Sequence, residues 1–182
     1  MIAECMLFLA TILPMGVDES THITNYLNCD RHVPASMQEY AEHYVEHFEF
    51  NNLSKAVRIG WCESRGVETA YRSDNLDSGI MQFIPSTWNW IAEEYNLPKW
   101  NEWVILKDGR PYTENKVSKT NIGFEQVRVQ FSPYWNIKFA SLLAEEMYNR
   151  TQWRDWNSSK WCWNNPVKWN RLWNNEEKGY NE

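Results

Sequence analysis

Glu63 stands where an apolar stretch of the chain ends, in the segment WCES at residues 61–64, and not in a run of charged residues. After a polar interval the chain continues with the mostly apolar segment GIMQF at residues 79–83. A solvated glutamate has a pKa of about 4.3 and is almost fully ionised near neutral pH. Burial among apolar groups raises that pKa. Apolar neighbours could therefore keep Glu63 protonated and able to act as a general acid.

A second interpretation of Glu63 is an ordinary surface charge at the end of a helix. A carboxylate there is mildly unfavourable, because the helix dipole is negative at its C-terminus. Catalysis requires that the chain fold back, so that Glu63 faces Met81, Phe83 and Trp88. The spacing of these residues leaves both interpretations open.

Three groups of motifs, in order along the chain, resemble one known family. They are CESR at 62–65 with SGIMQFIPSTW at 78–88, YWNIKFASLLAEEM at 134–147, and WRDWNSSKWCW at 153–163. Over roughly residues 56–163 the chain resembles the lysozyme-like lytic transglycosylase domains, in the bacterial and phage subset with a Cys-Glu-Ser start. The resemblance implies a mainly α (α+β) fold, a lysozyme-like helical domain with a small β-hairpin. It also implies cleavage of the β-1,4 bond between N-acetylmuramic acid and N-acetylglucosamine in peptidoglycan.

The resemblance assigns roles to individual residues. Glu63 matches the family's single general acid and base, and no cofactor or metal is implied. Cys62 and Cys162 match two cysteines that occur together in that subset, which implies a disulfide. Asn136 and Ile137 match a structural helix start. The expected substrate-binding residues are the serine after the glutamate, the turn that borders the groove and nearby aromatic residues: Ser64, Gly79, Met81, Gln82, Phe83, Trp88 and Trp163.

Two reactions at Glu63 differ in what else they require. A transglycosylase needs one carboxyl, which protonates the leaving oxygen and then takes the proton of the muramyl 6-hydroxyl to form a 1,6-anhydro end. A hydrolytic lysozyme usually needs a second carboxylate. Asp74 and Asp77 are the candidates, although both also suit an Asx-type turn. A non-catalytic cell-wall-binding protein, or a phage virion structural protein with the same fold, is the third alternative.

Length and charge limit the class of protein. At 182 residues the chain is long enough for one domain with a substantial core. Its net charge of -6 and the lack of any basic run argue against nucleic acid as a partner. Peptidoglycan glycan strands are the expected partner, with membership of a phage particle or secretion assembly left open. The 12 tryptophans must either fill the core or line a groove where sugars stack.

Residues 1–30 differ in character from the domain expected over residues 31–182. Residues 6–15 form an apolar run that is too short to cross a bilayer, so no integral membrane span is expected. The run suits either an export signal or a buried arm, and both interpretations stay open. A peptidoglycan substrate implies a location in the periplasm, outside the cell or on a virion.

Four helices and one hairpin are expected to position these residues. Periodicity predicts helices over residues 33–50, 53–63, 85–95 and 134–150. Ser36 and Glu39 have the spacing of a capping box in the first helix. The pair Asp108-Gly109 predicts a hairpin turn, which lies in an expected insertion at residues 99–124.

His43 and His47 suggest a different chemistry, because H-x-x-E-H on one helix face is the pattern of inverted zinc proteases. Zinc would need a third protein ligand, and nothing downstream clearly supplies one. The polar side of an amphipathic helix is the simpler interpretation, and we expect no metal here.

Overall fold

The computed structural model describes residues 2–12, 29, 32–112, 123–147 and 153–165. The fold is mainly helical with small antiparallel sheets, which confirms the predicted fold class. Among the described residues, the order of elements begins with the helices α1 (Ile2–Ile12), α3 (Ala35–Gln38), α4 (Ala41–His47) and α5 (Phe50–Ser64). Helix α5 carries Glu63 in its last turn.

Helix α5 packs against α4, and the side chain of Tyr44 fills the space beside Gly60. Its buried face includes Ala56, Val57 and Gly60. A Cβ at Gly60 would lie 2.3 Å from the hydroxyl oxygen of Tyr44, which is fully buried on α4. A side chain at position 60 would therefore clash with the buried side chain of Tyr44 and displace it. The helix ends at Arg65, which has a φ of 59°.

The helix predicted over residues 33–50 is interrupted. It divides into α3 and α4 at residues 39–40, and Pro34 rather than Ser36 precedes the first turn, so the predicted capping box does not form. The interruption lets Tyr40 turn inward and donate a hydrogen bond to the carbonyl oxygen of Gly66 at 3.3 Å. A Cβ at Gly66 would lie 2.6 Å from the carbonyl oxygen of Ser36, so the end of α5 sits directly on the start of α3.

A short hairpin follows α5 and leads into the turn at residues 79–83. Strand β1 (Tyr71–Arg72) pairs antiparallel with β2 (Asp77–Ser78). Ser78 then forms an isolated antiparallel bridge with Phe83, which closes the turn between them. Helix α6 (Pro85–Tyr95) has the predicted bounds. It begins at its proline, and Asn96 is its C-cap.

The second sheet has the strand order β4-β3-β5. Strands β3 (Trp103–Lys107) and β4 (Arg110–Pro111) form the predicted hairpin around Asp108 and Gly109. Strand β5 (Phe124–Arg128) was not predicted. Its segment FEQVR has only a weak alternation of apolar and polar residues, so the sequence does not indicate a strand. Its antiparallel pairing with β3 stabilises the extended conformation.

Helix α7 (Pro133–Ser141) begins with Ser132 as its N-cap, and a π-helix labelled η2 (Leu142–Met147) continues it. A single 3₁₀ turn, η1 (Val129–Phe131), precedes it. Asn136 and Ile137 lie in the first half of α7, fully buried. The predicted end of this helix, at residue 150, falls outside the described residues.

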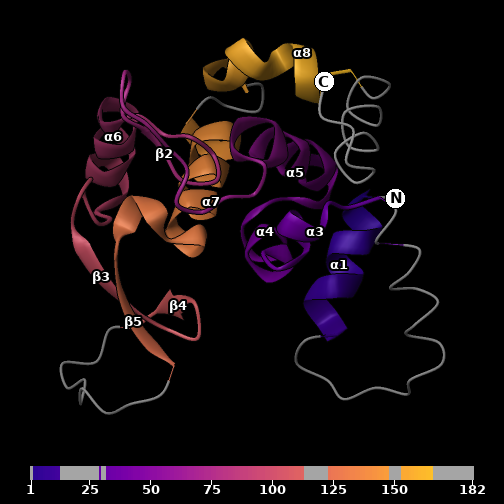
Figure 1. Ribbon diagram of the computed structural model, residues 1–182, viewed down its shortest axis with the longest axis horizontal. Coiled ribbons are helices and arrows are strands. Elements are labelled where there is room, and N and C mark those ends of the chain that lie inside the picture. The colour runs from indigo at the N-terminus through magenta and orange to yellow at the C-terminus, as the bar shows by residue number, and fades with distance from the viewer. Residues whose placement is uncertain (1, 13–28, 30–31, 113–122, 148–152, 166–182) are drawn as a thin grey trace.

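The C-terminal part of the described chain consists of the 3₁₀ helix η3 (Arg154–Ser159) and α8 (Lys160–Trp163). A disulfide joins Cys62 of α5 to Cys162 of α8, as predicted, with a Cα–Cα distance of 6.1 Å. Figure 1 shows α8 lying across one end of α5, with α6 and the three-stranded sheet on one side of the molecule and α1 on the other.

Helix α1 belongs to the packed core of the structure. Its residues Ala3, Met6 and Leu9 are buried, and Cys5 forms a disulfide with Cys29. Within the described residues, no helix has both the length and the apolar character needed to cross a bilayer.

The two disulfides should differ in their contribution to stability. In the chain-entropy model, the Cys62–Cys162 bond, which spans 100 residues, contributes about 4.7 kcal/mol, and the Cys5–Cys29 bond, which spans 24, about 3.5 kcal/mol. Replacing Cys62 and Cys162 by serine should therefore lower the free energy of unfolding more than replacing Cys5 and Cys29, as measured in urea. A larger loss from the N-terminal pair would contradict this order.

Candidate active site

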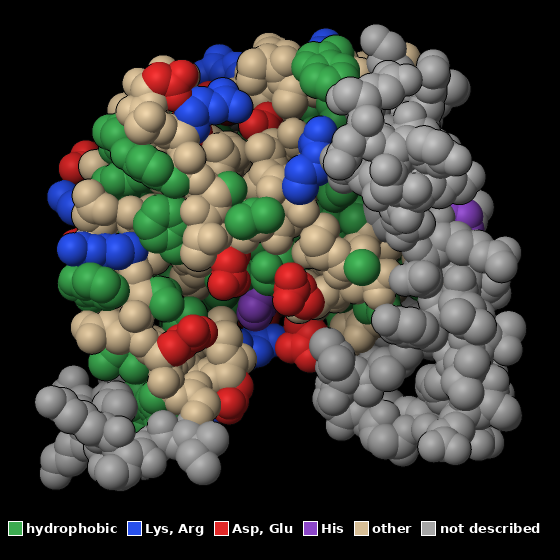
Figure 2. Space-filling view, viewed as in Figure 1, with side chains coloured by type: hydrophobic (Ala, Val, Ile, Leu, Met, Phe, Trp, Pro, Cys, Tyr) green, Lys and Arg blue, Asp and Glu red, His purple; other side chains and the backbone are tan. Residues whose placement is uncertain are grey.

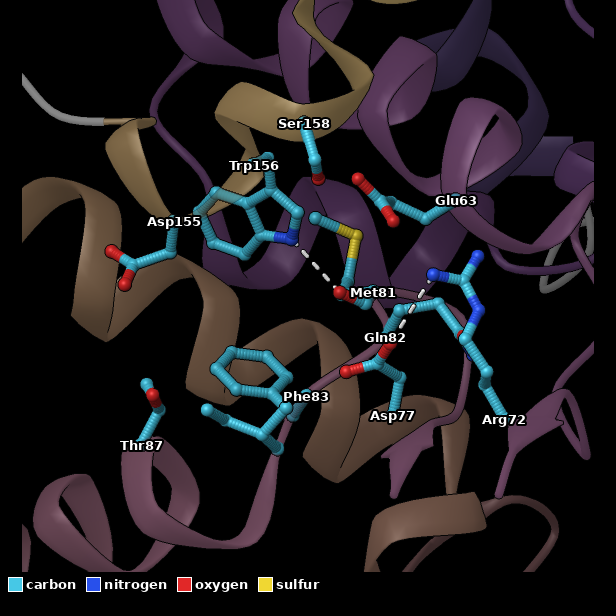
Figure 3. Close-up of a pocket in the computed structure, with 11 residues that line it drawn as sticks. Glu63, Arg72, Asp77, Met81, Gln82, Phe83, Thr87, Asp155, Trp156 and Ser158 are labelled. Atoms are coloured by element: carbon cyan, nitrogen blue, oxygen red, sulfur yellow. Dashed lines mark hydrogen bonds and ion pairs between the residues drawn. The ribbon is translucent and has the colours of Figure 1, made fainter. Parts of the chain in front are cut away.

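Glu63 opens onto a cleft between the end of α5, the 79–83 turn, the start of α6 and η3 (Figure 3). Its carboxyl group points into the space bounded by Ser158, Met81 and Arg72. The residues that line the cleft are Glu63, Arg72, Asp77, Met81, Gln82, Phe83, Ile84, Thr87, Asp155, Trp156 and Ser158. One potential proton donor thus faces a hollow whose walls come from five parts of the chain, which are α5, the β1–β2 hairpin, the 79–83 turn, the start of α6 and η3.

The surroundings of Glu63 favour its protonated form. Burial raises the pKa of this carboxyl above its ordinary value, and the negative charge of Asp77 raises it further. The hydrogen bond from Ser159 and the positive charge of Arg72 lower the same pKa and oppose this effect. Because burial is the largest cause, the net direction is upward, as the apolar sequence around Glu63 predicted.

Ser159 is the hydrogen-bonding partner of Glu63. Its hydroxyl lies within hydrogen-bonding range of the Glu63 carboxylate and also of the carbonyl oxygen of Trp156, the latter at 3.1 Å. A serine hydroxyl carries one proton and two lone pairs. It can therefore donate to an ionised Glu63, or accept from a protonated Glu63 while donating to Trp156. The same contact holds the carboxyl in place in both of its charge states.

Met81 fixes the turn opposite Glu63 through its backbone. Its N–H donates to the side-chain oxygen of Asn136 at 2.7 Å, and its carbonyl oxygen accepts from the indole N–H of Trp156 at 2.8 Å. The Asn136 amide also donates to the carbonyl oxygens of Ser78 and Gln130. The turn is thus fastened to α7 on one side and to η3 on the other.

Asp77 is brought to the cleft and Asp74 is not. Asp77 lines the cleft and forms an ion pair with Arg72 at 3.5 Å, with 14% of its side chain exposed. Burial raises the pKa of Asp77, and the charge of Arg72 opposes this change. Asp74 is exposed in the β1–β2 turn and does not line the cleft. Asp77 is therefore the better placed of the two candidates for a second carboxylate.

The turn residues predicted to bind substrate divide into two groups. Met81, Gln82 and Phe83 line the cleft, as expected. Gln82 adopts a φ of 51°, and its side-chain amide donates to the carbonyl oxygens of Gly79 and Ala70, so it also holds the turn together. Gly79 does not line the cleft. A Cβ there would lie 2.2 Å from the side-chain nitrogen of Asn136, so its role is close packing.

Ser64, Trp88 and Trp163 lie away from the Glu63 cleft, contrary to expectation. Ser64 is buried and donates to the carbonyl oxygen of Gly60 at 3.0 Å, which stabilises the end of α5. Trp88 is fully buried and stacks on Phe139, with ring centroids 3.8 Å apart. Trp163 lines a separate cleft beyond η3.

Trp156, Ser159 and Arg72 are the residues of this site that the sequence did not reveal. The segment WRDWNSSKWCW contributed to the resemblance as a whole, without indicating which of its polar groups would face Glu63. Its link through Cys162 to the residue before Glu63 was the available signal. A disulfide next to a candidate acid brings the neighbours of its partner cysteine close to that acid.

His43 and His47 lie on α4, away from the cleft. Their rings contact the ring of Tyr134 edge-on, with centroids 5.6 and 4.7 Å apart. Burial lowers the pKa of His47 to about 4 and lowers that of His43 as well. Over the described ranges, no group of three or more potential ligands could hold a metal ion. The contacts of the two rings are those of residues packed between α4 and α7.

The comparisons with known proteins identify no relative of this chain. No protein-family model matches the chain, and neither a curated protein nor a solved structure matches it. The chemistry of this site is therefore inferred from its own residues and from the sequence motifs.

Removing the Ser159 hydroxyl should move the titration of Glu63. Because the hydrogen bond from Ser159 lowers the pKa of Glu63, Ser159→Ala should raise that pKa further. Ser159→Thr keeps a hydroxyl and should stay near the wild-type value. Titration of ¹³C-labelled glutamate side chains by NMR measures both.

Ser158→Ala is the matched control, since this neighbouring hydroxyl also lines the cleft. It should leave the titration of Glu63 close to that of the wild type. A pKa in Ser159→Ala that is unchanged or lower would show that Ser159 does not control the charge of Glu63.

Proposed function

We propose that the protein is a peptidoglycan lytic transglycosylase, with Glu63 as its single general acid and base. The observation that carries the proposal is one carboxyl whose pKa is raised by burial, held by a hydroxyl and facing an open cleft. General acid catalysis near neutral pH requires such a group. The ordered motifs around Glu63, Met81, Asn136 and Cys162 add the resemblance to the family.

In the first step, protonated Glu63 donates its proton to the glycosidic oxygen between N-acetylmuramic acid and N-acetylglucosamine. The C1–O bond breaks, and its electron pair leaves with the N-acetylglucosamine oxygen, which keeps the proton. Glu63 becomes a carboxylate, and the hydroxyl of Ser159 donates to it. Asp77 and Arg72 lie across the cleft as an ion pair, so their two charges partly cancel near the developing positive charge at C1.

In the second step, the Glu63 carboxylate removes the proton of the muramyl 6-hydroxyl. The oxygen of that hydroxyl forms a bond to C1, which closes the 1,6-anhydro ring and returns the proton to Glu63. Atoms and charges balance without water. Protonated Glu63 can then donate to the Ser159 oxygen while Ser159 donates to the carbonyl oxygen of Trp156.

A hydrolytic lysozyme is the second candidate, because Asp77 reaches the same cleft and raises the pKa of Glu63. In that reaction, a second carboxylate positions water or attacks C1. Burial raises the pKa of Asp77 and the positive charge of Arg72 opposes that rise, while the ion pair with Arg72 occupies the carboxylate that would have to attack C1 or hold the water. We therefore favour the transglycosylase.

The two disulfides suit an oxidising environment such as the outside of a cell. An enzyme acting on peptidoglycan would work in the periplasm, in the secreted state or as part of a phage particle. A non-catalytic wall-binding or virion protein is the alternative of another class. It would have no need of the raised pKa at Glu63.

Glu63→Gln should remove activity on purified sacculi, because the amide cannot donate an acidic proton or accept one back. The expected loss in rate is about 10²–10⁴-fold, the usual contribution of a general acid. Mass spectrometry of the released muropeptides should show 1,6-anhydro ends with the wild type. Reducing ends alone would reject the transglycosylase, and full activity of Glu63→Gln would reject an enzymatic role for this residue.

Asp77→Asn separates the two candidate reactions. For a transglycosylase, this variant should keep most of its activity. The pH at which its rate falls off on the alkaline side of the pH–rate profile should move to lower pH. The shift follows because loss of the Asp77 charge lowers the pKa of Glu63, so the carboxyl ionises earlier as pH rises. For a hydrolase, activity should fall by orders of magnitude. Asp74→Asn is the matched control, since that side chain lies outside the cleft lining.

A further inference from the structure

A second cleft lies on the other side of η3 from Glu63. Its lining residues are Lys55, Trp153, Arg154, Asn157, Lys160, Trp163 and Asn164. Three of them are cations, and none of the described residues that line it carries a carboxylate. This local excess of positive charge is unusual in a chain whose net charge is -6. We refer to it as the basic cleft.

The floor of the basic cleft is aromatic. Trp153 and Trp163 are both buried, and the ammonium group of Lys55 lies over both rings, 5.7 and 5.6 Å from their centroids. The rings therefore hold Lys55 in position at the base of the cleft. Lys160 is exposed at its edge.

The positive charges in the basic cleft repel one another. Burial lowers the pKa of Lys55, and the charges of Arg58 and Lys160 lower it further. An anion bound between Lys55 and Lys160 would relieve this repulsion. On the face drawn in Figure 2, several Lys and Arg side chains lie in the upper part, where Figure 1 places α5 and α8, while acidic side chains gather in the lower half.

The two clefts share one wall. Asp155, Trp156 and Ser158 of η3 line the Glu63 cleft, whereas Arg154 and Asn157 of the same short helix line the basic cleft. The indole N–H of Trp163 donates to the carbonyl oxygen of Trp156 at 2.9 Å, which joins the floor of one cleft to the wall of the other. The two clefts are therefore adjacent, one on each side of η3.

We propose that the basic cleft binds the carboxylates of the peptide stems that branch from the glycan strand held at Glu63. This inference rests on the proposed function and specifies the substrate as glycan that still carries its peptides. Muramyl residues bear these peptides beside the bond that is cleaved, and the peptides end in carboxylates that are ionised at neutral pH. Contact with them gives an acidic protein a local attraction to an otherwise repelled substrate.

The test measures binding, so that it does not depend on turnover. Soluble glycan strands with intact stems are titrated into Glu63→Gln protein by calorimetry, before and after amidation of the stem carboxylates with carbodiimide and ammonia. Amidation keeps the stems and removes their negative charge. We expect it to raise Kd roughly fivefold, as the loss of about two exposed ion pairs would. Relief of the general repulsion between anionic stems and a protein of net charge -6 would instead lower Kd on amidation.

Charge-removing substitutions locate the effect. Lys55→Gln with Lys160→Gln should raise Kd for native strands by a similar factor and make binding insensitive to amidation. Lys160→Gln alone should give part of the effect, and it changes only an exposed side chain, so the fold is kept. Lys99→Gln is the matched control, because Lys99 pairs with Glu93 in a different part of the molecule and should behave like the unsubstituted protein.

Equal affinity for native and amidated strands would overturn the proposal. A rise in Kd with Lys99→Gln as large as that with Lys55→Gln and Lys160→Gln together would also overturn it. Absence of binding to native strands would overturn it as well. None of these results touches the proposed reaction, which is judged by the muropeptides that wild-type protein releases. Conversely, a protein that binds stems in the basic cleft but releases no muropeptide would keep this inference and lose the enzymatic function.

Discussion

The disulfide between Cys62 and Cys162 is the constraint on which the candidate site depends. It fixes α8 to the last turn of α5, one residue before Glu63. The segment just before α8 then supplies Ser159, which contacts the carboxyl, and Trp156, which holds the opposite turn. Without this link the wall formed by η3 would be joined to α5 only by packing and by the hydrogen bond between Ser159 and Glu63. Water would then reach Glu63 more freely and bring its pKa back toward the ordinary value.

A second, noncovalent attachment holds the other side of the site. The side chain of Asn136 bonds to the backbone at Ser78, Met81 and Gln130, all in the core. A buried amide with its groups satisfied favours one arrangement of the chain, since any other leaves a polar group unpaired. Gly79 is required for the same reason, because a Cβ would occupy the space of the Asn136 amide. The cleft is therefore rigid where it faces Glu63.

The sequence predicted those features that have a local physical cause. The helix containing Glu63, the proline start of α6 and the Asp108-Gly109 turn all follow from residues near one another in the chain. The resemblance to the family also predicted the disulfide between Cys62 and Cys162. Neither could place Trp88, since a tryptophan that follows a groove motif on a helix can face inward or outward. The contact between Ser159 and Glu63 joins residues 96 positions apart, and no local pattern encodes it.

The proposed function requires an acidic protein to bind an anionic polymer, and the two clefts differ in the charges that line them. Burial raises the pKa of Glu63, and the negative charge of Asp77 adds to that rise. Both features make the catalytic cleft a poor place to attract carboxylates. Further cations next to Glu63 would attract the proposed substrate, but, like Arg72, they would also lower the pKa of Glu63. The position of Lys55 and Lys160 beyond η3 would satisfy both requirements of the proposed function, because these cations line a different cleft from Glu63.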